Sequence, residues 1–552
     1  MKRWRRYWFA EGGRGAAAVV RIALATAVLL TLHQLATRST VHIPAPAEVY
    51  RPVGIWMIFG YLVPPAPVVV ALWVVAIGAT LMMLVGLYAR ASTAVSFVAA
   101  LALASASFSG SASWSHQYNV VFLAQLAFLG ARGGDVWSID ALVRRRRGLR
   151  LLDVPRGYQW SLRLVQLAVA LMFAGAAFHK IAHGHFTLRW ALSDNLRNQL
   201  LVTFDLAGRP RPAIADWIID DVWRYRTAAT LNLLSQSAPM LACIFVRRPL
   251  IRAMAGGFFV LETVALGLVV GLWNQHWLPL VAVFIDWDRL YAALARRPVG
   301  DANAAAATDA AAAATDADPP PSRAAQRFIV AFVIYDAMTA LIPTLDQRLN
   351  TYPFSAFPMF AMVRARAPYD QHLPYSVPGD AFEVISDHPL DDHAQSWLDH
   401  MNRRLFLVTD PAAFENRLRL ILADMQRRFP DFGIHGLRHS LAIFEASAYP
   451  APARLEPHRI AVVGEIDAAG TFRSMLGTLD DRGVTVRPQH LDAAGARLVV
   501  YRDDEVTPHE LAAMRTGDRF ATGAITGDPL YVVAIVDGVP WLVASRKAWR
   551  WE

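Results

Sequence analysis

One lysine in an apolar stretch of the sequence is the first candidate for chemistry. Lys180 lies in the segment LMFAGAAFHKIAHGH, and lysine accounts for only three of the chain's 54 basic residues. Arginine stays protonated in proteins, whereas a buried lysine can lose its proton and act as a base. Two interpretations stay open. Lys180 is a catalytic base, or it extends to the outer lipid headgroups as lysines at helix ends do.

A second candidate is His116, in the segment SASWSHQYNVVFLAQL, where Trp114 and Tyr118 flank it. If the predicted spans alternate, His116 and Lys180 lie on the same side of the membrane at similar depth. The alternative is structural, because amphipathic rings such as those of Trp114 and Tyr118 collect at membrane interfaces.

The histidines around Lys180 have a spacing that metal sites use. His179 and His183 are four residues apart, so they share one face of a helix. No carboxylate beside them offers a third ligand, so we predict no metal site and interpret His183 and His185 as polar residues at the helix end.

Two carboxylates interrupt apolar runs. Glu262 lies within GGFFVLETVALGLVV, and Asp336 within FIVAFVIYDAMTAL. A charge inside a membrane span is costly unless it faces the interior of the bundle and has a partner. For Glu262 the possible partners are Lys180, Arg163 and Arg21, and catalytic and structural roles both stay open. The amides Gln125, Gln166, Asn232 and Gln236 are predicted to form hydrogen bonds between helices.

The composition shows what kind of chain positions these residues. Of the 552 residues, 55% are hydrophobic and 18% are charged, and soluble domains have about 25% charged residues. The single cysteine, Cys243, excludes a disulfide scaffold and any cysteine-based metal cluster. We therefore expect an integral membrane protein with a soluble part.

Apolar runs of roughly 20 residues predict spanning helices. About nine are found, at 16–36, 66–88, 92–109, 117–131, 160–181, 227–246, 253–272, 275–291 and 325–343. Residues 52–63 are apolar too, but Pro64 and Pro65 separate them from the second span, and we interpret them as an interfacial segment. The fold class is thus a polytopic α-helical membrane bundle of about nine spans with a C-terminal extramembrane α+β domain.

The arginines orient the spans. Residues 1–344 hold 32 basic and 18 acidic residues, and residues 345–552 hold 22 and 27. If the spans alternate, the clusters near 1–6, 90, 144–147, 247–252 and 289–297 all lie on the side of the N-terminus. By the positive-inside rule we expect a multi-pass plasma (inner) membrane protein with a cytoplasmic N-terminus and an extracytoplasmic C-terminal domain. The basic excess thus belongs to membrane loops, which argues against nucleic-acid binding.

Four parts are predicted along the chain. They are a transmembrane bundle at 1–300, an Ala/Asp/Pro-rich cytoplasmic linker at 301–322, a last spanning helix at 323–344 and the outer α+β domain at 345–552. Short apolar segments with β-branched residues predict strands at 379–386, 439–447, 458–467, 496–505 and 528–545. Asp537-Gly538 predicts a hairpin turn within the last of these. Apolar residues at helical spacing predict a helix at 411–429.

Several of these segments resemble the HTTM (horizontally transferred transmembrane) domain family. VVRIALATAVLL with Arg21 resembles its first span, and Trp114-Ser115-His116-Gln117-Tyr118 resembles a Trp-x-x-His-x-Tyr element of the vitamin K-dependent γ-glutamyl carboxylases in that family. Phe173 to Lys180 resembles their (Tyr/Phe)-x-Ala-Gly-x-x-Lys segment. TYPFSAFPMFAM, at 351–362, is similar to a segment that follows the spans in bacterial relatives.

The resemblance implies an enzyme that acts on a reduced quinone of the vitamin K hydroquinone type, with O₂ and CO₂ as co-substrates. Lys180 would be the base that deprotonates the hydroquinone and His116 the residue that supports it, with Trp114, Tyr118, His179 and Glu262 near the cofactor. Membrane lipid and a peptide or protein substrate at the outer face would be the partners. The alternative is a non-catalytic anchor whose outer domain binds a lipid or peptide, and a transporter is a third possibility.

Overall fold

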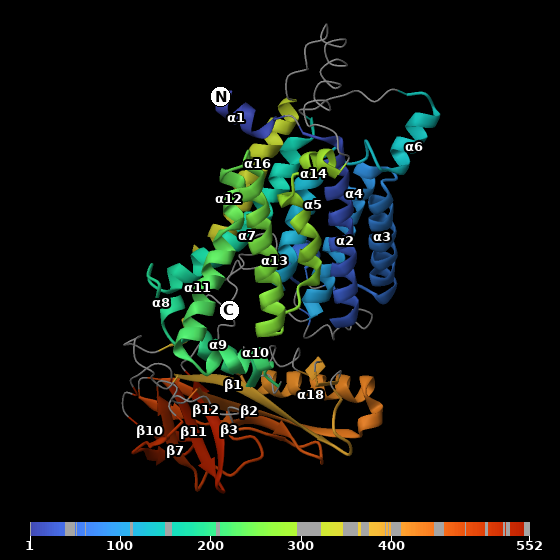
Figure 1. Cartoon of the computed structure of the whole chain (residues 1–552). Helices are drawn as coiled ribbons and strands as arrows, with labels where there is room; N and C mark the ends of the chain where they lie inside the picture. The colour runs from blue at the N-terminus through green and yellow to red at the C-terminus, as the bar shows by residue number, and fades with distance from the viewer. Residues whose placement is uncertain are drawn as a thin grey trace.

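The computed structural model shows a helical bundle with a β-rich region at one end (Figure 1). It describes residues 2–10, 12–38, 50, 52–60, 62–110, 114–149, 157–205, 210–294, 322–345, 363–365, 375–391, 394–395, 397–398, 410–446, 457–480, 482–502, 506–522, 525 and 530–545. The predicted linker, apart from Ser322, and the motif at 351–362 lie outside these residues.

Five helices in the described residues are long and apolar enough to cross a membrane. They are α2 (Arg14–Arg38), α3 (Ala66–Val85), α4 (Ala89–Gly110), α7 (Gln159–His183) and α13 (Pro249–Val270). Prolines at the first turns of α3 and α13 suit helix starts, and Gly86 and Gly271 end these helices in the left-handed conformation.

The expectation of nine membrane-length helices is not confirmed. The predicted span at 117–131 is a 3₁₀ turn, η3 (His116–Tyr118), followed by the ten-residue α5 (Asn119–Phe128). The span at 227–246 is divided between α11 (Val222–Ser237) and α12 (Pro239–Ile244). The span at 275–291 is a 3₁₀ helix, η5 (Gln275–Phe284), and a short α14 (Trp287–Leu294). The ninth corresponds to α16 (Arg323–Leu345).

Proline and burial explain the interrupted segments. Pro239 begins α12, and Pro279 lies inside η5, where an α-helix would lose a hydrogen bond. Nine residues of α5 and six of η5 are buried. Irregular backbone is tolerated at membrane depth where protein surrounds it. Apolar runs therefore predicted the location of these segments but not their length.

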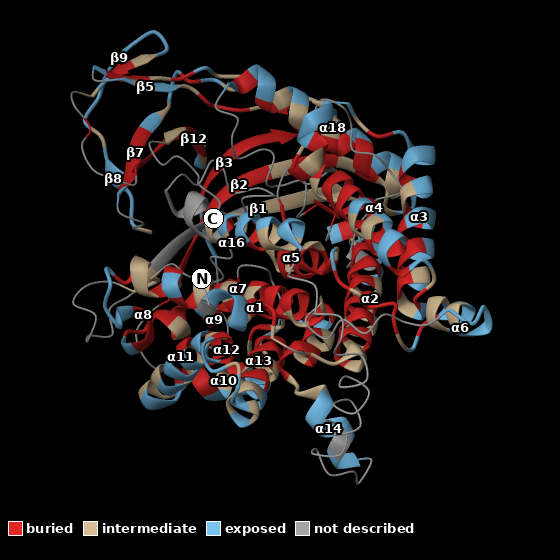
Figure 2. Cartoon of the chain, turned by 90° about the horizontal axis from the view of Figure 1, so that it is seen from above, coloured by how far each residue is buried: buried red, intermediate tan, exposed pale blue. Residues whose placement is uncertain are grey.

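The two ends of the bundle differ. Helices α1 (Lys2–Trp8), α6 (Ile139–Arg146) and α14 lie at one end, which we call the N-terminal end (Figure 1). Helices α8 (Arg189–Leu192), α9 (Asn195–Asp205) and α10 (Ala213–Ile219) lie at the other, beside the β-rich region. Figure 2 shows that α6 and α14 are largely exposed. The 3₁₀ helix η2 (Gly54–Phe59) exposes three apolar side chains, Met57, Ile58 and Phe59.

The β-rich region has two sheets. The larger has the strand order β1-β2-β3-β12-β11-β7-β8, and β4 (Phe472–Arg473) pairs with β3 beside this path. Its other strands are β1 (Tyr375–Ser386), β2 (Ile434–Ala446), β3 (Pro457–Ile466), β7 (Arg497–Arg502), β8 (His509–Glu510), β11 (Leu530–Val536) and β12 (Val539–Ser545). The four-stranded sheet contains β5 (Thr478–Asp480), β6 (Gly483–Thr485), β10 (Arg519–Ala521) and β9 (Met514–Thr516).

The strand and helix predictions for this region agree with the structure. Each of the five predicted segments contains a strand, and α18 (Pro411–Arg428) occupies the predicted helix. Asp537 and Gly538 have φ angles of 50° and 78° between β11 and β12, as a two-residue hairpin turn of type I′ requires. Asp410 caps α18 through its side chain.

The bundle and the larger sheet share a core. Ala442, Phe444 and Ala446 of β2 belong to the same cluster of buried residues as the bundle helices. Asn198 of α9 donates a hydrogen bond of 2.7 Å to the carbonyl of Arg364. The sheet is thus packed directly on the end of the bundle where α8, α9 and α10 lie (Figure 1).

Candidate functional site

Lys180 is near the end of α7, and its side chain is 1% exposed. Its Nζ donates hydrogen bonds to Asn232 Oδ1 and, over 2.9 Å, to Gln236 Oε1. Both acceptors belong to α11 and are four residues apart, so they share one face of that helix. The amine therefore points into the bundle and does not reach the lipid-facing surface.

The same two amides also bind Glu262 of α13. Asn232 Nδ2 and Gln236 Nε2 donate to Glu262 Oε1 over 2.6 Å and 2.8 Å. Ser235 Oγ donates to the other carboxylate oxygen over 2.7 Å. Glu262 is 2% exposed. Two amides on α11 thus bridge a buried amine on α7 and a buried carboxylate on α13, and we call Lys180, Asn232, Gln236, Ser235 and Glu262 the lysine cluster.

The hydrogen bonds of the lysine cluster have one consistent direction. The amide oxygens accept from Lys180, so the amide nitrogens face Glu262 and donate to it. This arrangement is complementary to an ammonium group at one side and a carboxylate at the other. Burying either charge without its partner would be strongly unfavourable. Of the three partners considered for Glu262, only Lys180 is linked to it, through the hydrogen bonds of Asn232 and Gln236. Arg21 instead donates to the Gly133 carbonyl, and Arg163 lies over the Tyr7 ring.

Trp190 covers the amine from the side of the β-rich region. Lys180 Nζ lies 4.4 Å from the centroid of the Trp190 ring, a cation–π distance. Trp190 belongs to α8 and packs with Ala177, Leu233 and Val363. Val363 directly follows the segment at 351–362 that the family resemblance singled out. The lysine cluster is therefore closed by residues at the boundary between the bundle and the β-rich region.

The residues on both sides of His116 form a second polar cluster at the same end of the bundle. The carbonyl of the next residue, Gln117, accepts a hydrogen bond of 2.7 Å from Trp277 Nε1. Tyr118 stacks on His276 with ring centroids 5.0 Å apart, and Trp114 Nε1 donates to Asn119 Oδ1 over 2.6 Å. Desolvation by the surrounding protein lowers the pKa of His116 to about 4, so the imidazole is neutral at physiological pH.

The structure does not join the two clusters through hydrogen bonds. Within the described residues, no hydrogen bond or ion pair connects Lys180 to His116. Phe173 packs on Trp277 with ring centroids 5.4 Å apart, and it precedes Lys180 by seven residues on α7. Seven residues correspond to about 10 Å of helix. His116 and Lys180 thus share one end of the bundle, with aromatic side chains in the path between them.

The other candidate residues, His179 and Asp336, are buried in the protein. His179 is 3% exposed, and its carbonyl is 3.1 Å from His183 Nδ1. Asp336 is 3% exposed in α16, and its Oδ2 has no hydrogen-bond partner among the described residues. No group of three or more histidine, cysteine or acidic side chains in that part of the chain is arranged to hold a metal ion.

Sequence reasoning underrated Asn232, Gln236 and Trp190. The two amides were expected only to join helices, and Trp190 was not assigned a role. The available signal was that Asn232 and Gln236 are four residues apart in one predicted span, and that the following predicted span contains Glu262. No pattern in the sequence indicated a role for Trp190, because it reaches Lys180 only through the fold of the loop after α7 and of the short helix α8.

No protein-family model, curated protein or solved structure matches this chain. The likeness to HTTM proteins therefore depends on the sequence motifs alone. The geometry of the lysine cluster is independent of that likeness, and it carries the functional argument that follows.

Proposed function

We propose that this protein is an HTTM-like membrane enzyme whose buried lysine deprotonates a reduced quinone. In this proposal the bundle crosses the plasma membrane nine times, with the N-terminus in the cytoplasm and the sheets outside. The observation that supports it best is the buried Lys180 amine, linked through Asn232 and Gln236 to the Glu262 carboxylate.

The lysine cluster would assist a base by stabilising the protonated product, because Lys180 can accept a proton only as the neutral amine. A neutral amine that takes a proton from a weakly acidic hydroxyl would become the ammonium that the amides and Glu262 stabilise. The substrate hydroxyl would approach on the side that Trp190 covers, since the other side of the amine faces α11. Ala177, Leu233 and Val363 pack with Trp190 there and make that side of the amine apolar, as the surroundings of a quinone ring would have to be.

A bound hydroquinone of the vitamin K type would supply the electrons with which O₂ is activated, so that a glutamate γ-proton is removed and CO₂ is added. The chain's own contribution is to hold the amine and exclude water. His116, neutral and at the same end of the bundle, would assist proton movement near the mouth, between Trp114 and Tyr118.

The test is turnover of vitamin K hydroquinone by membranes that contain the wild-type protein, Lys180→Ala or Lys180→Arg. General base catalysis contributes about 10²–10⁴-fold, so we expect both variants to form epoxide at least about a hundredfold more slowly. Lys180→Arg is the matched control, because arginine keeps the charge and the donors but cannot act as a base. Equal epoxide formation by wild type and Lys180→Ala would exclude the proposal.

A second candidate function follows from the completeness of the lysine cluster. Two hydrogen bonds and the Trp190 ring already occupy the surroundings of the Lys180 amine. A purely structural role would make the bundle an anchor for an outer domain that binds a lipid or peptide. This reading predicts no hydroquinone turnover by the wild type and normal partner binding by Lys180→Arg.

A further inference from the structure

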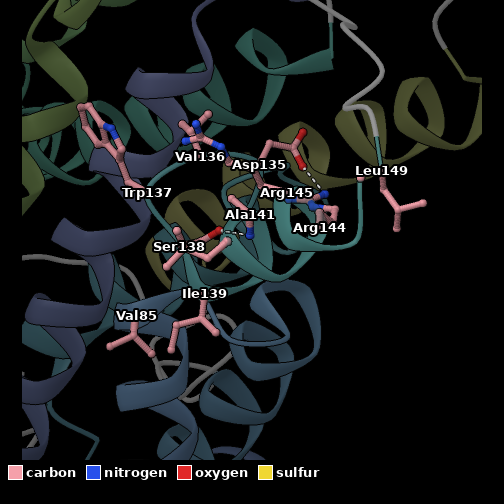
Figure 3. Close-up of a pocket in the computed structure, with 12 residues that line it drawn as sticks. Val85, Asp135, Val136, Trp137, Ser138, Ile139, Ala141, Arg144, Arg145 and Leu149 are labelled. Atoms are coloured by element: carbon pink, nitrogen blue, oxygen red, sulfur yellow. Dashed lines mark hydrogen bonds and ion pairs between the residues drawn. The ribbon is translucent and has the colours of Figure 1, made fainter.

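One hollow in the described residues lies at the N-terminal end of the bundle, at the opposite end from the lysine cluster. It has a volume of about 800 Å³ and lies between the end of α3 and α6 (Figure 3). Val85, Val136, Ile139 and Leu142 give it apolar walls, and Arg144 and Arg145 supply positive charge. We call it the α3–α6 hollow.

The frame of the α3–α6 hollow is built by buried polar contacts. Arg21 of α2 donates to the carbonyls of Gly133 and Trp137 over 2.7 Å and 2.6 Å, which fixes the loop before α6. Ser138 caps α6 by accepting from the Ala141 amide. Asp140 accepts from the amides of Tyr88 and Ala89, both over 2.8 Å, which ties α6 to the start of α4. The hollow is therefore a defined feature of the fold.

An apolar stripe on α3 leads into the hollow. Val70, Val74, Ile77, Leu81 and Val85 recur at steps of three and four residues and are 40–67% exposed. Residues at this spacing lie on one face of a helix. In a helix of a membrane bundle, such an exposed apolar face contacts the acyl chains of lipids. Val85, the last residue of the stripe, also lines the hollow.

The charge at the hollow is positive. Arg132 and Arg144 bind the carboxylate of Asp135, and Tyr158 donates to it over 2.8 Å. Burial raises the pKa of Asp135, but these hydrogen bonds outweigh it and leave the pKa below its usual value, so the carboxylate is ionised and already paired.

Arg145 adds to this charge, and two more arginines follow it outside the lining of the hollow. Arg145 lines the hollow, and Arg146 and Arg147 follow it in the sequence. All three are exposed, and no acidic side chain in the described residues pairs with them.

We propose that the α3–α6 hollow binds an anionic phospholipid from the leaflet at the N-terminal end. The phosphate would bind the guanidinium group of Arg145, which matches phosphate oxygens in planar geometry. Arg144, which already binds Asp135 and donates to the Gly134 carbonyl over 2.5 Å, would add positive charge beside it. One acyl chain would lie along the α3 stripe and enter the apolar walls. A lipid fits better than a soluble phosphate compound or a cytoplasmic protein, because the polar rim and the lipid-facing stripe form one continuous surface.

The test compares binding of short-chain phosphatidylglycerol and phosphatidylcholine to the full-length protein in detergent, by native mass spectrometry. The variant is Arg145→Gln. The matched control is Arg146→Gln, which removes the same charge from the next position but lies outside the lining. A basic residue beside an anionic headgroup contributes about 1 kcal/mol, so we expect about fivefold weaker phosphatidylglycerol binding for Arg145→Gln and little change for the control.

A second variant tests the apolar part of the hollow. Ala141 lines it, and Ala141→Phe would fill it without changing any charge. We expect this variant also to lose retained phosphatidylglycerol, at unchanged melting temperature. Equal binding of both lipids, equal losses for Arg145→Gln and Arg146→Gln, or full competition by inorganic phosphate would each overturn the proposal.

Discussion

Replacement of Glu262 by leucine is expected to destabilise the bundle by about 3–5 kcal/mol, because it leaves the Lys180 ammonium buried without a negative partner. Lys180 is 1% exposed and has no path to lipid headgroups in this arrangement. Asn232 and Gln236 would also lose the acceptor for their amide nitrogens. The apparent melting temperature in detergent should fall, on the order of 3–4 °C for a chain of this size.

A double variant at Lys180 and Glu262 measures how strongly the two charged residues depend on each other. Lys180→Met alone leaves Glu262 ionised with three neutral donors and is also expected to destabilise. Lys180→Met combined with Glu262→Leu removes both charges, so its loss of stability should be clearly smaller than the sum of the two single losses. The coupling between the two positions would then be at least about 1 kcal/mol, although their charged groups do not touch.

Leu261→Ala provides the control for Glu262→Leu. Leu261 is the preceding residue of α13 and is 53% exposed on the outer face. Its truncation should change the melting temperature little. If Glu262→Leu were as stable as Leu261→Ala, the Lys180 amine and the Glu262 carboxylate would not form a buried pair of opposite charges, and the coupling expected between the two positions would be absent.

The lysine cluster shows how far sequence reasoning reaches in a membrane bundle. Scarcity of lysine marked Lys180, and the cost of a charge in an apolar run marked Glu262. Each of the two residues could be identified by itself, because one charged residue stands out within an apolar segment. Their connection was not predictable, since it depends on how α7, α11 and α13 rotate against one another, and apolar faces in lipid give no periodic signal for that rotation.

The expected nine membrane-length helices are not confirmed, for a related reason. Hydropathy measures whether a segment is apolar, and η5 and α5 are apolar. It does not measure whether the segment is a continuous helix, because buried protein surroundings can satisfy 3₁₀ and interrupted backbone. Pro239 and Pro279 were visible in the sequence and indicate the breaks.

In the β-rich region, the six longer strands of the larger sheet, of six to thirteen residues, were predicted because apolar segments with β-branched residues are distinctive. Its two-residue strands β4 and β8 were not predicted. The strands of the four-stranded sheet have only two or three paired residues each, below the length at which alternation can be recognised. The hairpin at Asp537-Gly538 was predicted from two residues, because few sequences adopt two successive positive φ angles.

Replacement of Arg21 by methionine is the second large effect that we expect, at about 2–6 kcal/mol. Arg21 is fully buried in α2, and its guanidinium satisfies the carbonyls of Gly133 and Trp137. Methionine fills much of the same volume but donates no hydrogen bond, and each buried acceptor left without a partner costs about 1–3 kcal/mol. The loop before α6 would then lose its attachment to the bundle.

The distinguishing measurement is hydrogen exchange at residues 133–141 beside the melting temperature of the whole chain. Arg21→Met should increase exchange there and reduce phosphatidylglycerol binding at the α3–α6 hollow, because the loop forms one wall of it. Arg21→Lys should give an intermediate result, since lysine keeps a donor but cannot reach both carbonyls in the geometry of a guanidinium. Arg90→Met, at an exposed position near the same end, is the control for loss of a basic residue. Unchanged exchange in Arg21→Met would show that other contacts hold the loop, and the hollow would then not depend on Arg21.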